Sequence, residues 1–423
     1  MPAQHPDSVK PLIDHLFRHE SGKLIAILTK IFGPVNLELA EDVVQDTLLK
    51  ALDHWKFHGI PDNPSAWLFT AARNKALDVI RRERYKKEFA GELSALLKSE
   101  YSAGTTLNFL INENEIQDEQ LRMMFVCCHP VVAGEGQVAL ILKTLCGFSV
   151  AEIAKAFLTN EETIAKRLYR AREQFRQQNI RFEFPLPGDL PQRRESVLTA
   201  IYLLFNEGYN SSSYDMVIRE DLVEESLRLA YLLSNHPVTK SPNTFALLAL
   251  LCFQAARLYG RIDNQNHLLT LRHQDRSIWN KELIGHGSLF LQQASQGDSV
   301  SPYHIEAGIA YEHCVAVDFA STNWKRILEL YDWLHQIKPN PMVALNRAIV
   351  VAELEGAGAG LAALDLIRDI QALENYYLLP AIRADFLART GEKSKAKQNL
   401  EKALTLTDSP AEKELLKKKI GEL

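Results

Sequence analysis

Basic, aromatic and amide side chains gather in one short stretch of this 423-residue sequence. Between Thr70 and Lys87 there are seven lysines and arginines against two acidic residues, a local charge of +5. Guanidinium and ammonium groups neutralise phosphates, while aromatic rings and amides stack on or hydrogen-bond to unpaired bases. Trp67 and Asn74 supply the ring and the amide on the same predicted helix face as Arg81. This pattern indicates a surface for single-stranded nucleic acid; the plainer alternative is a solvated charged helix face with a half-buried tryptophan.

A second basic stretch covers residues 161–181, with six basic residues against three acidic ones, a local charge of +3. Two capping-box patterns, Ser149 with Glu152 and Thr159 with Glu162, predict a short helix, a turn and a longer helix. A helix of this width and charge fits the major groove, so the pattern is typical of a helix-turn-helix. Helical hairpins without DNA-binding function can imitate it. The longer helix would expose Thr163, Lys166, Arg167, Arg170 and Arg172.

An amphipathic helix is predicted before the first basic stretch, where it would present an acidic face. Its apolar residues recur at three- and four-residue steps: Ala40, Val43, Val44, Thr47, Leu48, Ala51, Leu52 and Trp55. Its wet side would carry Glu41, Asp42, Gln45, Asp46 and Lys50. After a loop over residues 56–62, Asn63 can cap the next helix, with Pro64 at its first position.

The helix that starts at Pro64 has two contrasting faces at 100° per residue. The apolar face gathers Leu68, Phe69, Ala72, Ala76, Val79 and Ile80. The opposite face gathers Trp67, Asn74, Asp78, Arg81, Arg82 and Tyr85. The apolar face would pack inside the protein and leave the basic, aromatic face in water.

Composition bounds the fold class. Hydrophobic residues make up 46% and charged residues 24%, which is typical of a globular protein of roughly two to four domains. The periodic segments read as helix, so an all-α fold is expected. The sequence has no run of about 18 uncharged apolar residues and no visible secretion signal, which predicts no membrane span. Five irregularly spaced cysteines indicate a reducing cytoplasm instead of a disulfide framework.

Two motif sets together resemble a known family. Ala40–Thr47, Trp67–Asn74 and Asp78–Arg82 resemble region 2 of the extracytoplasmic-function (ECF, group IV) sigma factors of bacterial RNA polymerase. Gly147–Ala154 followed by Thr163–Arg172 resembles their region 4. Two independent sets in the family's order are more specific than either alone.

The rest of the chain resembles the subgroup of these factors with a C-terminal tetratricopeptide-like extension. Cys127–Pro130 and Phe205–Tyr209 contribute to this likeness, together with the helical tail. In the tail, Ala348 and Ala352 precede Ala384 and Ala388 by 36 residues, close to the tetratricopeptide period of about 34. Stacked helical hairpins make surfaces that bind peptides or proteins. The tail is therefore expected to regulate the rest of the chain in cis, with a purely structural cap as the alternative.

The resemblance implies partners and contact residues. Core RNA polymerase would be bound through the β′ clamp helices and the β flap, and promoter DNA through both basic helices. The β′ clamp would contact Asp42, Gln45 and Asp46. The melted −10 element would contact Trp55, Trp67, Arg73, Asn74, Arg81 and Arg82. The −35 duplex would contact Thr163, Lys166, Arg167, Tyr169 and Arg170.

The expected domain organisation follows from the motifs and from the proline-rich segment near residue 187. Sigma region 2 forms a helical bundle and region 4 a helix-turn-helix, and the C-terminal half is helical. The expected ranges are 1–87 for region 2, 88–118 for a linker, 119–181 for region 4, 182–192 for a linker, 193–300 for a helical extension and 301–423 for the tetratricopeptide-like repeats.

Other chemistry finds little support in the sequence. Adjacent Cys127 and Cys128 cannot easily both bind one tetrahedral ion, so they are expected to pack structurally with His129. No H-E-x-x-H, phosphate-binding loop or G-x-S-x-G elbow occurs. Neither an enzyme activity, a cofactor nor a metal is predicted. Residues 205–213 are expected to form a polar loop after an apolar helix, with a small-ligand or docking site as the sharper hypothesis.

Two other functions remain open at this stage. One is a stand-alone helix-turn-helix DNA-binding regulator with a sensory helical domain, which would not need the acidic face around Asp42 and Asp46. The other is a tetratricopeptide scaffold protein in which the DNA-like motifs are vestigial. Binding to core polymerase and promoter-specific transcription distinguish both from the initiation factor.

Overall fold

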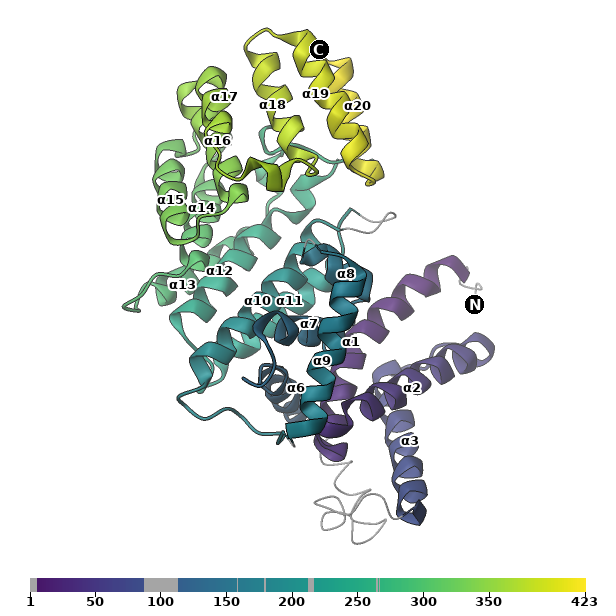
Figure 1. Ribbon diagram of the computed structural model, residues 1–423. Coiled ribbons are helices and arrows are strands. Elements are labelled where there is room, and N and C mark those ends of the chain that lie inside the picture. The colour runs from purple at the N-terminus through teal and green to yellow at the C-terminus, as the bar shows by residue number, and fades with distance from the viewer. Residues whose placement is uncertain are drawn as a thin grey trace. The chain divides into compact units, whose positions relative to one another are not determined.

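The computed structural model describes residues 6–86, 113–157, 159–178, 180–211, 217–263, 265 and 267–423. Over these residues the regular secondary structure is helical, apart from one isolated antiparallel bridge between Ile262 and Leu268. The predicted all-α class is confirmed. The chain divides into two compact units, Met1–Leu204 and Phe205–Leu423 (Figure 1). No described helix is both long enough and apolar enough to cross a bilayer.

Unit 1 begins with α1 (Pro6–Phe32), the short 3-10 helix η1 (Pro34–Asn36), α2 (Leu37–His58) and α3 (Pro64–Lys86) (Figure 1). Gly59 ends α2 with a φ of 78°, a left-handed conformation that glycine adopts without strain, and its N–H donates to Trp55 O at 2.9 Å. Asn63 caps α3 as predicted, because its Oδ1 accepts from the Ala66 N–H at 2.9 Å. This sharp turn places α3 against both α1 and α2.

The second half of unit 1 contains α6 (Glu113–Cys127), α7 (Gly134–Thr144), α8 (Val150–Ala156) and α9 (Glu161–Gln178). The predicted linker 88–118 lies outside the described residues up to position 112, and α6 occupies its end. The capping box at Ser149 and Glu152 is present in full. The second predicted box is wrong by one position, because Asn160 caps α9 through its Oδ1 and the Thr163 N–H at 2.8 Å.

The helix-turn-helix packs as its sequence predicts. Ile153, Ala154, Ile164 and Leu168 are all buried between α8 and α9. Helix α1 packs against α2 and also against α6, so it contacts both halves of unit 1. A Cβ on Gly22 of α1 would lie only 2.2 Å from Leu145 O, so only glycine permits this close approach.

Helix α10 (Leu190–Tyr209) belongs to both units, because the unit boundary falls after Leu204. It starts inside the segment predicted as the linker 182–192. Its first half packs onto unit 1, where Ser196 Oγ donates to Gln137 Oε1 at 2.7 Å. Residues 205–209 form its last turn, so the loop predicted to start at Phe205 is wrong at its beginning; residues 212–216 lie outside the described part. The apolar periodicity of the helix simply continues past Leu204.

The first helices of unit 2 surround one buried helix. They are α11 (Glu220–Asn235), α12 (Pro242–Ala256) and α13 (Lys281–Ala294), with 3-10 turns η2 (Leu258–Arg261), η3 (Leu271–His273) and η4 (Arg276–Ile278) between the last two. Helix α12 is apolar on almost every side and packs against α11, α13 and α14. An all-round apolar helix is stable only when neighbours cover it completely.

The remaining helices of unit 2 follow one another as packed neighbours (Figure 1, green to yellow). They are α14 (Pro302–Val315), α15 (Trp324–Ile337), α16 (Pro341–Glu355), α17 (Ala357–Asp365), η5 (Ile370–Leu373), α18 (Leu378–Arg389), α19 (Lys393–Leu406) and α20 (Pro410–Gly421). The repeated alanines Ala348 and Ala352 of α16 and Ala384 of α18 are buried in hydrophobic clusters. The tetratricopeptide assignment itself stays a prediction.

Candidate nucleic-acid interface

The acidic face of α2 reaches solvent. Asp42, Gln45 and Asp46 are all exposed, as the periodicity predicts. Asp46 forms an ion pair with Lys75 of α3, at 2.7 Å between Oδ2 and Nζ. Asp42 forms no ion pair within the described part of the chain. Its charge is therefore the more available of the two for a partner.

The basic face of α3 is also exposed to solvent. Asn74, Arg81 and Arg82 are exposed, and Trp67 and Arg73 are half-buried. Arg73 Nη2 donates to Asn74 Oδ1 at 3.3 Å, and the Arg81 guanidinium lies 3.5 Å from Asp78. Exposed pairs of this kind contribute little stability and can be exchanged for phosphate contacts.

Trp55 does not lie on this surface. Its side chain is only 4% exposed, and its ring packs against Phe17 at 5.7 Å and Trp67 at 5.6 Å between centroids. The prediction that Trp55 contacts the −10 element is therefore not supported by its position. Trp55 occupies the last core position of α2 and positions Trp67.

Sequence reasoning missed an aromatic group at the end of α2. His54 stacks on His58 at 4.3 Å between ring centroids, and His54 also contacts Trp67 at 5.4 Å. Phe57 is 78% exposed beside them. The four-residue spacing of the two histidines was the available signal. Flat rings at the edge of α3 extend the surface on which unpaired bases can stack.

Helix α9 presents part of its predicted contact set freely. Tyr169 and Arg170 are exposed, and Lys166 is exposed while it pairs with Glu162 at 2.6 Å. Thr163 is half-buried next to the cap of the helix. These four residues form a continuous polar and basic side of a helix whose opposite side packs on α7 and α8.

Arg167 is held by the protein itself. Its guanidinium pairs with Glu135 of α7 and lies over the Phe157 ring at 5.5 Å from the ring centroid. The side chain is half-buried. Arg167 therefore braces the helix-turn-helix, and its Nη2 is already paired with Glu135.

Two residues predicted to be exposed form an internal ion pair. Arg172 of α9 donates through Nη2 to both carboxylate oxygens of Glu41 on α2, at 2.8 and 3.1 Å. Thr144 Oγ1 donates to the same carboxylate at 3.2 Å, and Arg176 pairs with Glu38 one turn away. Both side chains of the central pair are less than one-fifth exposed. This contact joins α2 to α9.

The two cysteines of the cysteine-histidine segment are buried, and His129 is half-buried. Cys127 and Cys128 are 0% exposed and form no disulfide, and burial raises the pKa of both thiols. A protonated, inaccessible thiol is a poor metal ligand and a poor nucleophile. The residues described here hold no group of three or more side chains placed to bind a metal ion.

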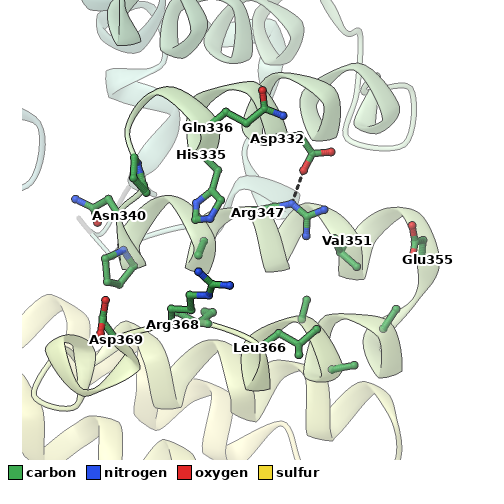
Figure 2. A pocket seen from close by; sticks show the side chains of 17 residues that line it. Asp332, His335, Gln336, Asn340, Arg347, Val351, Glu355, Leu366, Arg368 and Asp369 are labelled. Atoms are coloured by element: carbon green, nitrogen blue, oxygen red, sulfur yellow. Dashed lines mark hydrogen bonds and ion pairs between the residues drawn. The ribbon is translucent and has the colours of Figure 1, made fainter.

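Unit 2 carries a separate cavity of about 1010 Å³ between α15, α16 and α17 (Figure 2). Arg347 and Asp332 pair at one side of it at 2.5 Å, and His335 and Arg368 point toward its centre. Asp369 at its edge adopts a left-handed conformation with a φ of 55°. The cavity wall is mixed, with small alanines between charges of both signs.

Comparison with known protein families matches three parts of the chain. Residues 16–85 match Sigma-70 region 2, and residues 135–175 match Sigma-70, region 4. Residues 193–295 match a family of unknown function (DUF6596). The two sigma matches contain the exposed α3 face and the exposed side of α9.

Individual relatives extend this picture. The uncharacterized protein R00370 of Rhizobium meliloti (strain 1021) is 32% identical over 388 residues, which cover 92% of this chain and 90% of the relative. The ECF RNA polymerase sigma factor SigL of Mycobacterium tuberculosis (H37Rv) is 31% identical over 133 residues, 31% of this chain and 70% of SigL. No solved structure matches.

Proposed function

Because this chain belongs to the sigma-70 family of transcription initiation factors, we propose that it binds core RNA polymerase and directs it to promoters as an ECF-type factor. The observation that carries the proposal is the exposure of two separate cationic helix surfaces, on α3 and on α9, within the two matched sigma regions. The printed name of the similar SigL protein supports the ECF subgroup.

The face of α3 would hold the melted −10 strand. Arg81 and Arg82 would neutralise phosphates, while Trp67 and Asn74 would contact bases that have left the duplex. Unstacking a base costs a few kcal/mol, which contacts in a protein pocket can offset. The rings of His54 and Phe57 enlarge the available stacking surface.

The exposed side of α9 would enter the −35 major groove through Lys166, Tyr169 and Arg170. Groove recognition combines phosphate neutralisation with side-chain contacts to base edges. Arg167 would contribute through the guanidinium donors that Glu135 does not engage.

Both DNA contacts cannot form while α2 and α9 are joined. Two promoter elements about 25 base pairs apart are separated by roughly 85 Å at about 3.4 Å per base pair. A compact unit of 204 residues has a radius of gyration of roughly 17 Å and spans only about half of that distance. We therefore infer that the Arg172–Glu41 contact opens when the chain engages polymerase and promoter.

Unit 2 would regulate this activity in cis, with a peptide or protein as a further partner of the C-terminal repeats. The support for this idea is the continuous helix α10, which contributes to both units. A change in unit 2 therefore has a direct covalent route into the packing of α10 on α7, through Ser196 and Gln137.

The polymerase contact is tested with Asp42→Arg. The exposed carboxylate would face basic residues of the β′ clamp, so charge reversal should weaken capture of core polymerase at least tenfold. The matched control is Asp298→Arg, another exposed acidic residue, in the turn after α13 of unit 2. Equal capture by both variants would contradict the proposed contact and favour a stand-alone DNA-binding regulator.

A further inference from the structure

Two buried arginines in unit 2 share one tryptophan ring. Arg257 follows the end of α12 and Arg276 starts η4, and each guanidinium carbon lies 5.1 Å from the centroid of Trp279. Arg257 is 8% exposed, Arg276 5% and Trp279 2%. Arginine stays charged under all ordinary conditions, so this cluster buries two positive charges together.

The guanidinium groups of the two arginines differ in how many hydrogen bonds they form. Arg276 Nη1 donates to His313 O at 2.9 Å and Ala316 O at 3.1 Å, which caps the end of α14, and Nη2 donates to Thr322. The guanidinium of Arg257 has one long hydrogen bond, 3.5 Å to Gln254 Oε1. The hydrogen bonds to the end of α14 explain why Arg276 is buried. The single long hydrogen bond of Arg257 does not explain why that residue is buried.

The cluster has fewer acceptors than donors, and the acidic residue whose charge acts on Arg276 is Asp318. No aspartate or glutamate in the described chain forms an ion pair with Arg257 or Arg276. Four buried nitrogens have no hydrogen-bond partner among the described residues: Nε of Arg257, Nε of Arg276, Nε1 of Trp279 and Nδ1 of His313. Nearly all buried polar groups in proteins are paired, so such a concentration needs an explanation.

The surroundings show the same excess of positive charge. Burial, together with the charges of Arg257 and Arg276, lowers the pKa of His313 to about 3, so this imidazole stays neutral. Burial and the charge of Arg257 also lower the pKa of Arg276 and of Arg261. Water molecules could supply acceptors, but they do not compensate buried charge as an anion does.

We propose that Arg257 and Arg276 form a binding site for a phosphate group, either inorganic phosphate or the phosphate of a small molecule. The guanidinium fork matches the oxygen spacing of phosphate, and the Nε atoms of both arginines are unoccupied donors. Arg257 has the largest exposed fraction of the three central residues, at 8%. All three central residues lie within the match to the family of unknown function, so the site gives that part of the chain a ligand-binding role.

The site is separate from the surfaces assigned to DNA and polymerase, which lie in unit 1. Phosphate binding to unit 2 therefore tests a property that does not depend on the proposed initiation activity. Failure of one proposal leaves the other standing.

Equilibrium dialysis of the full chain against radiolabelled inorganic phosphate at constant ionic strength tests the proposal. We expect saturable binding of one phosphate per chain. Arg257→Met should weaken binding at least tenfold, and Arg257→Lys should also weaken it because it keeps the charge and loses the fork. Arg326→Met on the surface of α15 is the control and should bind like the parent chain.

The outcomes are distinguishable even if one variant does not fold. If Arg257→Met fails to fold, the Arg257→Lys variant decides alone, since it retains the positive charge. Competition with O-phosphoserine separates the two sources of phosphate: displacement at a lower concentration than by inorganic phosphate indicates a phosphorylated small molecule. No saturable binding by the parent chain, or unchanged binding by both Arg257 variants, would overturn the site.

Discussion

Arg170 and Arg172 are two positions apart on α9 and differ in exposure and in contacts. Arg170 is exposed, whereas Arg172 is turned inward onto Glu41. In a helix a shift of two residues rotates a side chain by about 200°, which is enough to exchange solvent for a neighbouring helix. A count of basic residues along α9 therefore overstates the number available to DNA.

Replacing Arg170 by alanine should weaken −35 duplex binding by the assembled holoenzyme and lower the log–log salt slope by about 0.9, since one phosphate contact is lost. Binding to core polymerase should stay unchanged. Fluorescence anisotropy of labelled promoter DNA over a series of salt concentrations measures the slope. Arg326→Ala on α15 serves as the control, and an unchanged slope for Arg170→Ala would remove this residue from the interface.

For single residues, the sequence predicted exposure to solvent better than it predicted contact partners. The periodicity of α2 correctly exposed Asp42, Gln45 and Asp46, and that of α3 exposed Asn74 and the two arginines after it. It placed Glu41 and Arg172 in water because a single helix does not reveal which other helix covers it. Trp55 followed its apolar period into the core, and the expected DNA contact came only from the resemblance.

Helices α2 and α9 carry the proposed polymerase and −35 surfaces, and one cluster of charges joins them. Glu38 and Glu41 face Arg176 and Arg172, and Thr144 adds a hydrogen bond. The central pair is mostly shielded from solvent, so it is stronger than an exposed pair, but its desolvation keeps the net energy modest. A contact of this size can hold the free chain closed and still yield to a larger binding partner.

Reversing one charge of this cluster should open it. Arg172→Glu places a carboxylate against Glu41, so amide hydrogens in the second half of α9 should exchange about tenfold faster, equivalent to ~1.4 kcal/mol. The double variant Glu41→Arg with Arg172→Glu restores opposite charges and should recover most of the protection. Hydrogen exchange with peptide-level mass spectrometry measures both. Equal exchange in the parent and the single variant would show that this pair does not hold α9.

At the scale of the whole molecule, the bounds of α10 differ from those that the sequence predicted. A linker was expected at 182–192, but α10 runs from Leu190 to Tyr209 and packs its first half on unit 1. Proline-rich segments are good indicators of a change in chain direction. The local sequence does not show which unit a helix packs against. A truncation at residue 192 would therefore remove part of the core of unit 1, and a chain ending at Asn210 keeps α10 complete.

In vitro transcription with purified core RNA polymerase over a promoter library tests the central claim most directly. We expect discrete promoter-specific transcripts with the full chain and none with core enzyme alone. The chain ending at Asn210 should change the transcript yield if unit 2 regulates in cis. Transcription no greater than that of core enzyme alone, with both the full and the shortened chain, would contradict the assignment of this protein as an initiation factor.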